Sequence, residues 1–156
     1  MIAATDAPSA STRTQRASGS GADPELTVII VSYNTCALTL KAIETLYATT
    51  LNTQFRTVVY DNASSDGSAR AIAQAFPQVE VIASSENLGF AKANNVVAAN
   101  AATEWLLLLN PDTECHAGAV DNLLAFSKAH PSAGITGGRT TFPDGSLNVA
   151  SCWRRI

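Results

Sequence analysis

Cysteines, basic residues and long apolar runs are all scarce in this sequence of 156 residues. The three cysteines, Cys36, Cys115 and Cys152, are scattered without a CxxC pair, which fits a reducing compartment better than a disulfide framework. The sequence has 10 lysine and arginine residues and 13 acidic residues, a net charge of −3. This charge argues against non-specific binding to the phosphate backbone of nucleic acids. No stretch approaches the roughly 20 apolar residues of a transmembrane helix, so we expect a cytoplasmic protein.

The first 24 residues also lack large aliphatic side chains, apart from Met1 and Ile2. They are rich in alanine, serine and threonine, a composition that buries too little apolar surface to fold. They contain no apolar core of a secretory signal. We therefore expect residues 1–24 to form a disordered leader and residues 25–156 to form the folded part.

Apolar runs alternate with helical patterns four times after Pro24, which predicts an α/β fold with a mostly parallel sheet. In the first helix, Leu38, Ala42, Ile43 and Leu46 are expected to form the apolar stripe. The second helix is expected to be capped near Ser64 or Ser65. The expected strands are 26–33, 55–61, 79–84 and 104–110. The expected helices are 34–50, 64–76, 89–102 and 117–130. After the fourth helix we expect a fifth strand at 134–139 and a hairpin at 140–151.

Polar residues stand where each of the four strands ends. Ligands of parallel α/β sheets bind beyond the carboxyl ends of the strands, which meet at one edge. Four polar exits at one edge predict a binding site there. The four exits are Ser32-Tyr33-Asn34, Asp61-Asn62, Glu86-Asn87 and Asn110-Pro111-Asp112.

The usual phosphate-binding glycine motifs are missing. The run after the first strand, SYNTCA, contains no glycine of a GxGxxG loop, and no P-loop occurs. A diphosphate would then need another partner, and a Mg²⁺ or Mn²⁺ ion held by Asp112 can serve as one. The ring of Tyr33 offers a stacking surface for a base, and the carboxylate of Asp61 can accept a hydrogen bond from a uracil-type N–H.

Four motifs, VIIVSYNT, VVYDNASSDGS, NLGFAKANN and LLLLNPDTE, resemble those of family 2 glycosyltransferases in order and approximate spacing. The chain is most similar to the rhamnosyltransferase-like branch, with a Rossmann-like, three-layer GT-A fold. The resemblance implies an inverting transfer of a sugar, with rhamnose as a candidate, from a UDP- or dTDP-linked donor. The implied acceptor is a hydroxyl of a glycan or lipid-linked sugar in cell-surface polysaccharide synthesis, at the inner face of the membrane or in the cytoplasm.

The resemblance also implies roles for individual residues. Asn110 stands where many relatives have the first aspartate of a DxD motif, and its neutral oxygen offers a weaker metal ligand. The matched positions are Ser32 and Tyr33 at the nucleotide base, Asp61 as the base-binding aspartate, Asn87, Gly89 and Asn95 near the nucleotide and sugar, and Asp112 at the metal.

The catalytic base and the acceptor half of such enzymes find no match in this sequence. Glu114 is too close to Asp112 to act as the base, and Asp144 falls in an expected turn. Residues 25–156 are therefore expected to form the donor-binding part of a fold that is incomplete at its C-terminus. The alternatives are a non-catalytic nucleotide-binding module, alone or completed by a partner chain, and an interaction fragment with an open sheet edge.

Overall fold

Strand β1 (Leu26–Ser32) forms the centre of the fold, and all seven of its residues are buried. The computed structural model describes residues 23–148. Within them, β1 pairs in parallel with β2 (Phe55–Asp61) on one side and with β4 (Trp105–Leu108) on the other, and β2 pairs in parallel with β3 (Glu80–Ala83). The resulting order, β3-β2-β1-β4, confirms the predicted α/β fold with a parallel sheet.

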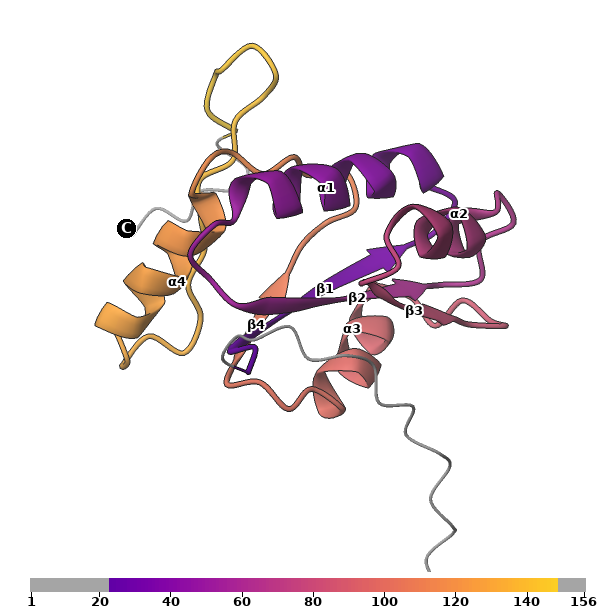
Figure 1. The fold of residues 1–156 in the computed structure, drawn as a ribbon, viewed down its shortest axis with the longest axis horizontal. Helices are drawn as coiled ribbons and strands as arrows, with labels where there is room; N and C mark the ends of the chain where they lie inside the picture. Colours follow the sequence, from indigo (N-terminus) through magenta and orange to yellow (C-terminus); the bar gives the residue numbers. More distant parts are fainter. Residues whose placement is uncertain (1–22, 149–156) are drawn as a thin grey trace, which may run out of the picture.

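Helices cover both faces of this sheet, as Figure 1 shows. On one face, Val28 and Ile30 of β1 pack in a buried cluster with side chains of α1, α2 and α4. On the other face, Ile29 and Val31 pack against α3. Because β1 is buried on both faces, its continuous apolar run is physically required. The helices are α1 (Cys36–Thr49), α2 (Ser68–Ala75), α3 (Phe90–Ala99) and α4 (Ala119–Ala129).

The elements expected after the fourth helix form only in part. The fifth strand predicted at residues 134–139 does not form, and three of its six residues are glycines, which weaken strands. The hairpin predicted at residues 140–151 has one bridge, between Thr141 and Leu147, closed by a turn in which the Gly145 N–H donates to the Phe142 carbonyl. Residues 149–151 of that hairpin and residues 1–22 of the expected leader lie outside the described residues.

Helix α2 begins later than the predicted cap at Ser64 or Ser65. Gly67 precedes the helix with a left-handed φ of 82°, and Ser68 is the first helical residue. The carboxylate of Asp66 accepts hydrogen bonds from the backbone N–H and the hydroxyl of Ser68. The carboxylate of Asp66 thus binds a backbone N–H at the start of the helix, the capping role that was predicted for Ser64 or Ser65.

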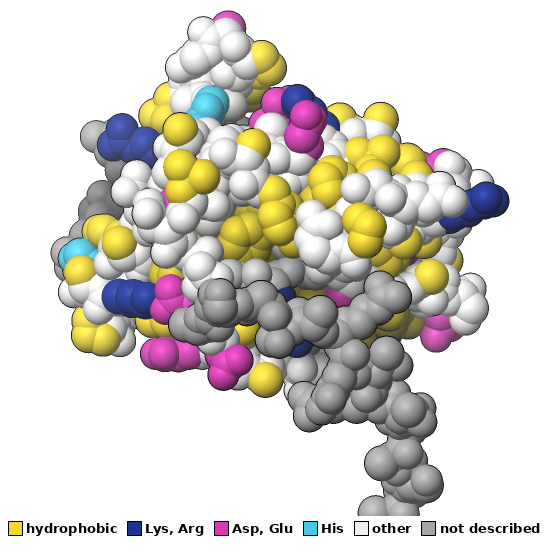
Figure 2. Space-filling view, viewed as in Figure 1, with side chains coloured by type: hydrophobic (Ala, Val, Ile, Leu, Met, Phe, Trp, Pro, Cys, Tyr) yellow, Lys and Arg dark blue, Asp and Glu magenta, His cyan; other side chains and the backbone are white. Residues whose placement is uncertain are grey.

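Charged side chains of both signs lie on the surface. On the face shown in Figure 2, lysine and arginine side chains lie apart from one another. Two of the lysines form ion pairs with acidic residues, Lys41 with Glu44 and Lys128 with Glu25. Among the described residues, no helix combines the length and the apolar character needed to cross a membrane.

Asp121, in the first turn of α4, fastens the loop between α1 and β2. Its carboxylate accepts hydrogen bonds from the N–H groups of Leu51 at 2.9 Å and Asn52 at 3.2 Å. Burial alone would raise the pKa of Asp121, but these N–H groups together with Thr53 hold that pKa below its ordinary value. The ionised form is therefore the one that the fold stabilises.

Asp121→Asn is expected to lower the free energy of unfolding at pH 7 by about 1 kcal/mol, the value of an exposed, charge-assisted interaction. Because the folded-state pKa is depressed, this contribution is complete above the unfolded pKa of about 3.9 and disappears as the pH falls through the folded pKa. Thermal unfolding of both proteins from pH 7 to pH 3 measures the difference. Glu104→Gln, at an exposed carboxylate, is the control. A difference between Asp121→Asn and the original protein that stays constant with pH would contradict this account.

Candidate functional site

The carboxyl ends of the strands meet at one edge of the sheet, as the sequence predicts. Ser32 at the end of β1 is in register with Asp61 at the end of β2, and Asp61 is in register with Ala83 at the end of β3. The chain leaves β4 beside β1, where the Leu109 N–H donates to the Ile29 carbonyl at 2.9 Å. All four predicted exits therefore open at the same edge.

A hollow of about 400 Å³ lies at this edge and collects four of the seven predicted site residues. These are Tyr33, Asn87, Gly89 and Asp112. Tyr33 is 51% exposed, so much of this residue is accessible to a ligand that stacks on its ring. The hollow thus combines the ring of Tyr33 with the carboxylate of Asp112, whereas Asp61, the carboxylate predicted to bind the base beside Tyr33, is not among its lining residues.

Two of the predicted residues lie elsewhere. Ser32 is fully buried, and its hydroxyl lies 3.1 Å from the hydroxyls of both Thr35 and Thr39 at the start of α1. Its side chain therefore serves the packing of α1 on the sheet. Asn95 is exposed on α3 and lines a different hollow, which also includes Leu106 of β4.

Asp61, at the end of β2, is 2% exposed and does not line the hollow itself, although the next residue, Asn62, does. Its Oδ1 atom accepts a hydrogen bond from the Ser64 N–H at 2.9 Å. Its Oδ2 atom is buried and has no hydrogen-bond donor among the described residues. A buried acceptor without a donor costs about 1–3 kcal/mol, so a ligand N–H that reached this atom would remove a penalty already present.

Asn62 and Asn87 join the exit of β2 to the start of α3. The Asn87 Oδ1 atom accepts hydrogen bonds from Nδ2 of Asn62 at 2.8 Å and from the Gly89 N–H at 2.9 Å. The Asn62 Oδ1 atom accepts one from the Leu88 N–H at 2.8 Å. Gly89 has φ 76° and ψ 163°, a conformation that is essentially restricted to glycine. These contacts hold the wall of the hollow in one shape.

The hollow also includes residues that are not among the seven predicted site residues. Asn62 and Asn110 line the hollow, and both belong to strand exits that the sequence had already marked as polar. Leu38 and Phe90 line it as well and are 51% and 53% exposed. The assignment of Leu38 to the buried stripe of the first helix was wrong, because Thr39 takes the buried position beside Ser32.

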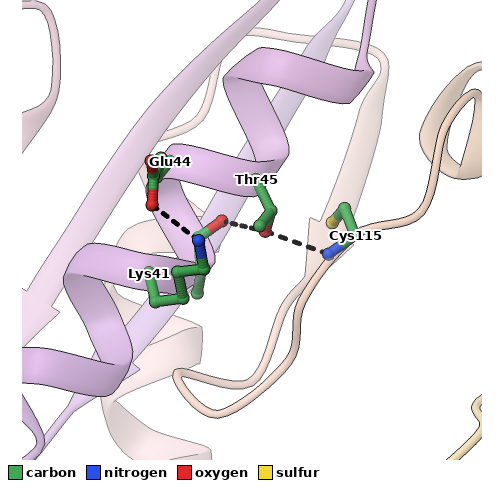
Figure 3. Close-up of polar contacts among 5 residues, drawn as sticks. Lys41, Glu44, Thr45 and Cys115 are labelled. Atoms are coloured by element: carbon green, nitrogen blue, oxygen red, sulfur yellow. Dashed lines mark hydrogen bonds and ion pairs between the residues drawn. The ribbon is translucent and has the colours of Figure 1, made fainter. Parts of the chain in front are cut away.

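The loop that carries Asp112 is anchored to α1. The Thr113 N–H donates to the Asn110 carbonyl at 3.2 Å and closes a turn around Pro111. Three residues beyond Asp112, the Cys115 N–H donates to the hydroxyl of Thr45 on α1 at 3.0 Å, a contact that Figure 3 shows. The rigid turn leaves the carboxylate of Asp112 exposed, with no hydrogen bond or ion pair to the rest of the described chain.

This arrangement fits a divalent cation that is shared with a ligand. No three His, Cys, Asp or Glu side chains among residues 23–148 gather closely enough to hold a metal by themselves. Mg²⁺ and Mn²⁺ bind phosphate-containing ligands through only one or two carboxylates, the remaining ligands being phosphate oxygens and water. Asp112 and the amide oxygen of Asn110, both in the wall of the hollow, are suitable protein ligands.

Thr45→Val is expected to loosen this loop, because valine keeps the shape of threonine but cannot accept the Cys115 N–H. We expect the free energy of unfolding to fall by about 1 kcal/mol, the typical net value of one hydrogen bond. Chemical denaturation measures it. Thr49→Val is the matched control, since the Thr49 hydroxyl donates only within α1, to the Thr45 carbonyl. Equal losses in the two variants would show that the loop contact contributes nothing of its own.

Comparison with known proteins places this geometry in a family. The family described as Glycosyl transferase family 2 matches this chain over residues 27–155. Two proteins of Mycobacterium tuberculosis, from different strains, are 32% identical over 98 residues. Both are named N-acetylglucosaminyl-diphospho-decaprenol L-rhamnosyltransferase. The match covers 56% of this chain but 32% of each relative, so the chain spans about a third of the length of these curated relatives.

Solved structures show the same fold. One is PcManGT, a mannosyltransferase from Pyrobaculum calidifontis that was solved in complex with GDP-Man and Mn²⁺. It superposes with a TM-score of 0.60 at 24% sequence identity, and the match covers 68% of this chain and 33% of PcManGT. Residues 1–349 of S. aureus TarS in complex with UDP give a TM-score of 0.61 at 22% identity, over 69% and 33%. These likenesses confirm the predicted GT-A-type fold. Because the family match spans most of the sequence, the chain belongs to glycosyl transferase family 2.

Proposed function

We propose that this chain binds the nucleoside diphosphate sugar of an inverting glycosyl transfer, with a pyrimidine base as in UDP or dTDP. The observation that carries the proposal is the shared hollow, which places the exposed ring of Tyr33 and the unpartnered carboxylate of Asp112 on one surface. The ring suits one end of such a donor, and the carboxylate suits the other.

Each end of the donor has its own partners in this proposal. The base stacks on Tyr33 and donates its N–H to the unpaired Oδ2 atom of Asp61, which requires the loop above Asp61 to admit it. The diphosphate lies toward Asn110 and Asp112, which hold a Mg²⁺ or Mn²⁺ ion. When bound, that cation offsets the charge that develops on the leaving diphosphate. Asn87 and Gly89 also line the hollow.

The relatives support a narrower assignment. The name of the mycobacterial relatives supports rhamnose as the transferred sugar and a lipid-linked sugar as the acceptor. The TarS complexes with UDP and UDP-GlcNAc support a uridine donor, and the PcManGT complex supports a divalent cation. A lipid-linked acceptor would place the reaction at the inner face of the membrane, in the synthesis of a cell-surface polysaccharide. We propose these as the sugar, the acceptor and the place of action.

The lining of the hollow also supports the second candidate, a nucleotide-binding module without catalysis of its own. Inverting transfer needs a base that takes the proton of the acceptor hydroxyl. Among the described residues that line the hollow, Asp112 is the one carboxylate, and its proposed task is to hold the cation. The two candidates share the donor site and differ only in whether transfer follows binding.

Calorimetry with UDP, dTDP and GDP, each with Mn²⁺ and with a chelator, tests the shared proposal. We expect UDP or dTDP to bind more tightly than GDP, and to bind more tightly with Mn²⁺ than without it. Equal binding of all three nucleotides would contradict the pyrimidine site, and no binding at all would overturn the proposal. Release of free sugar from a UDP- or dTDP-linked donor then distinguishes a catalytic chain from a binding module.

A further inference from the structure

The loops that follow β1 and β2 are joined through Asn34. The Asn34 backbone N–H donates to the hydroxyl of Ser64 at 2.9 Å. In the opposite direction, the Asn34 Oδ1 atom accepts hydrogen bonds from the N–H of Ser65 at 2.8 Å and from its hydroxyl at 3.3 Å. The residue that follows the exposed ring therefore holds the loop that follows the buried carboxylate.

This linkage continues to Asp61 itself. Ser64 accepts from Asn34 through its hydroxyl and donates through its backbone N–H to the Oδ1 atom of Asp61. With Oδ1 occupied, Oδ2 is the oxygen that remains without a donor. The contacts of Asn34 and Ser64 thus fix which carboxylate oxygen is left for a ligand.

Both loops hold a residue in the left-handed backbone region at this point. Asn34 has φ 53° and Ala63 has φ 67°. Residues other than glycine rarely adopt this region, although asparagine tolerates it better than most. Strained conformations of this kind persist where surrounding contacts over-determine them, and they concentrate at functional sites. Here the contacts between Asn34 and the serines supply that constraint.

We propose that Asn34 is a positioning residue for the nucleobase. Its left-handed backbone and its hydrogen bonds to Ser64 and Ser65 set the direction of the Tyr33 ring and of the free oxygen of Asp61. This inference rests on the proposed function, because it assigns Asn34 to the base end of that donor site. Asn34 itself does not line the hollow, so it acts through its neighbours and not by contact with the ligand.

Three substitutions of Asn34 separate its backbone from its side chain. Asn34→Ala removes both the tolerance of positive φ and the acceptor, and we expect the Kd for UDP with Mn²⁺ to rise about tenfold, the equivalent of one net hydrogen bond. Asn34→Gly keeps the backbone conformation but loses the acceptor, so a smaller rise is expected. Asn34→Asp keeps an acceptor oxygen and should restore most of the affinity.

Pyrophosphate with Mn²⁺ is the second probe. If Asn34 had only a general structural role, its substitution would weaken the binding of pyrophosphate as well as that of UDP. Because pyrophosphate has no base, its Kd should stay unchanged in all three variants, while the Kd of UDP rises in Asn34→Ala and, to a smaller extent, in Asn34→Gly. Ser64→Ala, which deletes the acceptor of the Asn34 N–H, should reproduce the selective loss from the other loop. The matched control is Asn52→Ala, at an exposed asparagine whose N–H is also hydrogen-bonded, in the loop that Asp121 fastens.

The outcomes distinguish the inference from the function on which it rests. If the original protein binds UDP no more tightly than pyrophosphate, the proposed base site is wrong and the inference falls with it. If UDP binding is stronger in the original protein but survives Asn34→Ala and Ser64→Ala unchanged, only the inference is overturned. An equal loss of UDP and pyrophosphate binding would likewise assign Asn34 a general structural role. A thermal unfolding midpoint for each variant confirms that folded proteins are compared.

Discussion

Asp112→Ala is expected to remove the dependence of UDP binding on Mn²⁺. In the presence of Mn²⁺, UDP affinity should fall on the order of a hundredfold, the upper range seen when groups that support a metal site are lost. The reason is the small number of protein ligands. No cluster of three ligating side chains exists among the described residues, so the loss of one carboxylate removes the main charge on the protein side of the cation. Binding without metal should change little, because Asp112 makes no other contact that the fold needs.

Calorimetric titration with UDP, in Mn²⁺ and in chelator, measures both quantities. Glu114→Ala is the matched control, since Glu114 is an exposed carboxylate two residues further along the same loop but does not line the hollow. We expect it to retain the response to Mn²⁺. If Asp112→Ala still bound UDP more tightly with Mn²⁺, or if Glu114→Ala lost the response to the same extent, the assignment of Asp112 to the metal would be wrong.

The strands and the edge at which they end can be predicted from sequence because burial imposes a pattern on them. The predicted strand 55–61 matches β2 to the residue, and β1 ends one residue before the predicted boundary. A strand covered on both faces needs a continuous apolar run, and such a run ends where the chain meets solvent. Polar exits from parallel strands then converge through topology alone. The apolar pattern and the topology together therefore suffice to place Tyr33 and Asp112 at one hollow.

The fates of individual side chains could not be predicted in the same way. The family resemblance implied a site role for Ser32, and the helical pattern assigned Leu38 to the core. The structure buries Ser32 and places Leu38 in the wall of the hollow. Their positions depend on how α1 is rotated against the sheet, which the Ser32–Thr39 contact settles. Asn95 depends similarly on the rotation of α3. Asn34 makes its contacts to a loop that is 30 or more residues away in sequence, and no local pattern reports such contacts.

Asp61 at the end of β2 and Asp66 in the loop that follows are two carboxylates in different surroundings. The carboxylate of Asp66 is fully used: the hydroxyl of Ser68 and the N–H of Cys36 hold its pKa below the ordinary value. Asp61 is buried and has one oxygen without a donor. An acceptor left in that condition lowers stability, and a protein retains such a penalty where the group serves a ligand.

Asp61→Asn is therefore expected to move stability and UDP affinity in opposite directions. The amide oxygen can still accept the Ser64 N–H, and a neutral group replaces a charged one at the buried, unpaired position. We expect the free energy of unfolding to rise by about 1 kcal/mol, because unpaired charge is costlier to bury than an unpaired amide. UDP affinity should fall at least about tenfold, since an N–H would then face the N–H of uracil.

The same substitution should change the preferred base. Cytosine presents an acceptor nitrogen where uracil presents an N–H, so the amide of Asp61→Asn can donate to it, and the ratio of CDP to UDP affinity should rise. Asp66→Asn is the matched control: removing an acceptor oxygen that is already satisfied should lower the unfolding midpoint and leave that ratio unchanged. Thermal unfolding and calorimetry with both nucleotides measure the two effects. A loss of stability in Asp61→Asn together with an unchanged base preference would show that the buried oxygen is structural and does not read the base.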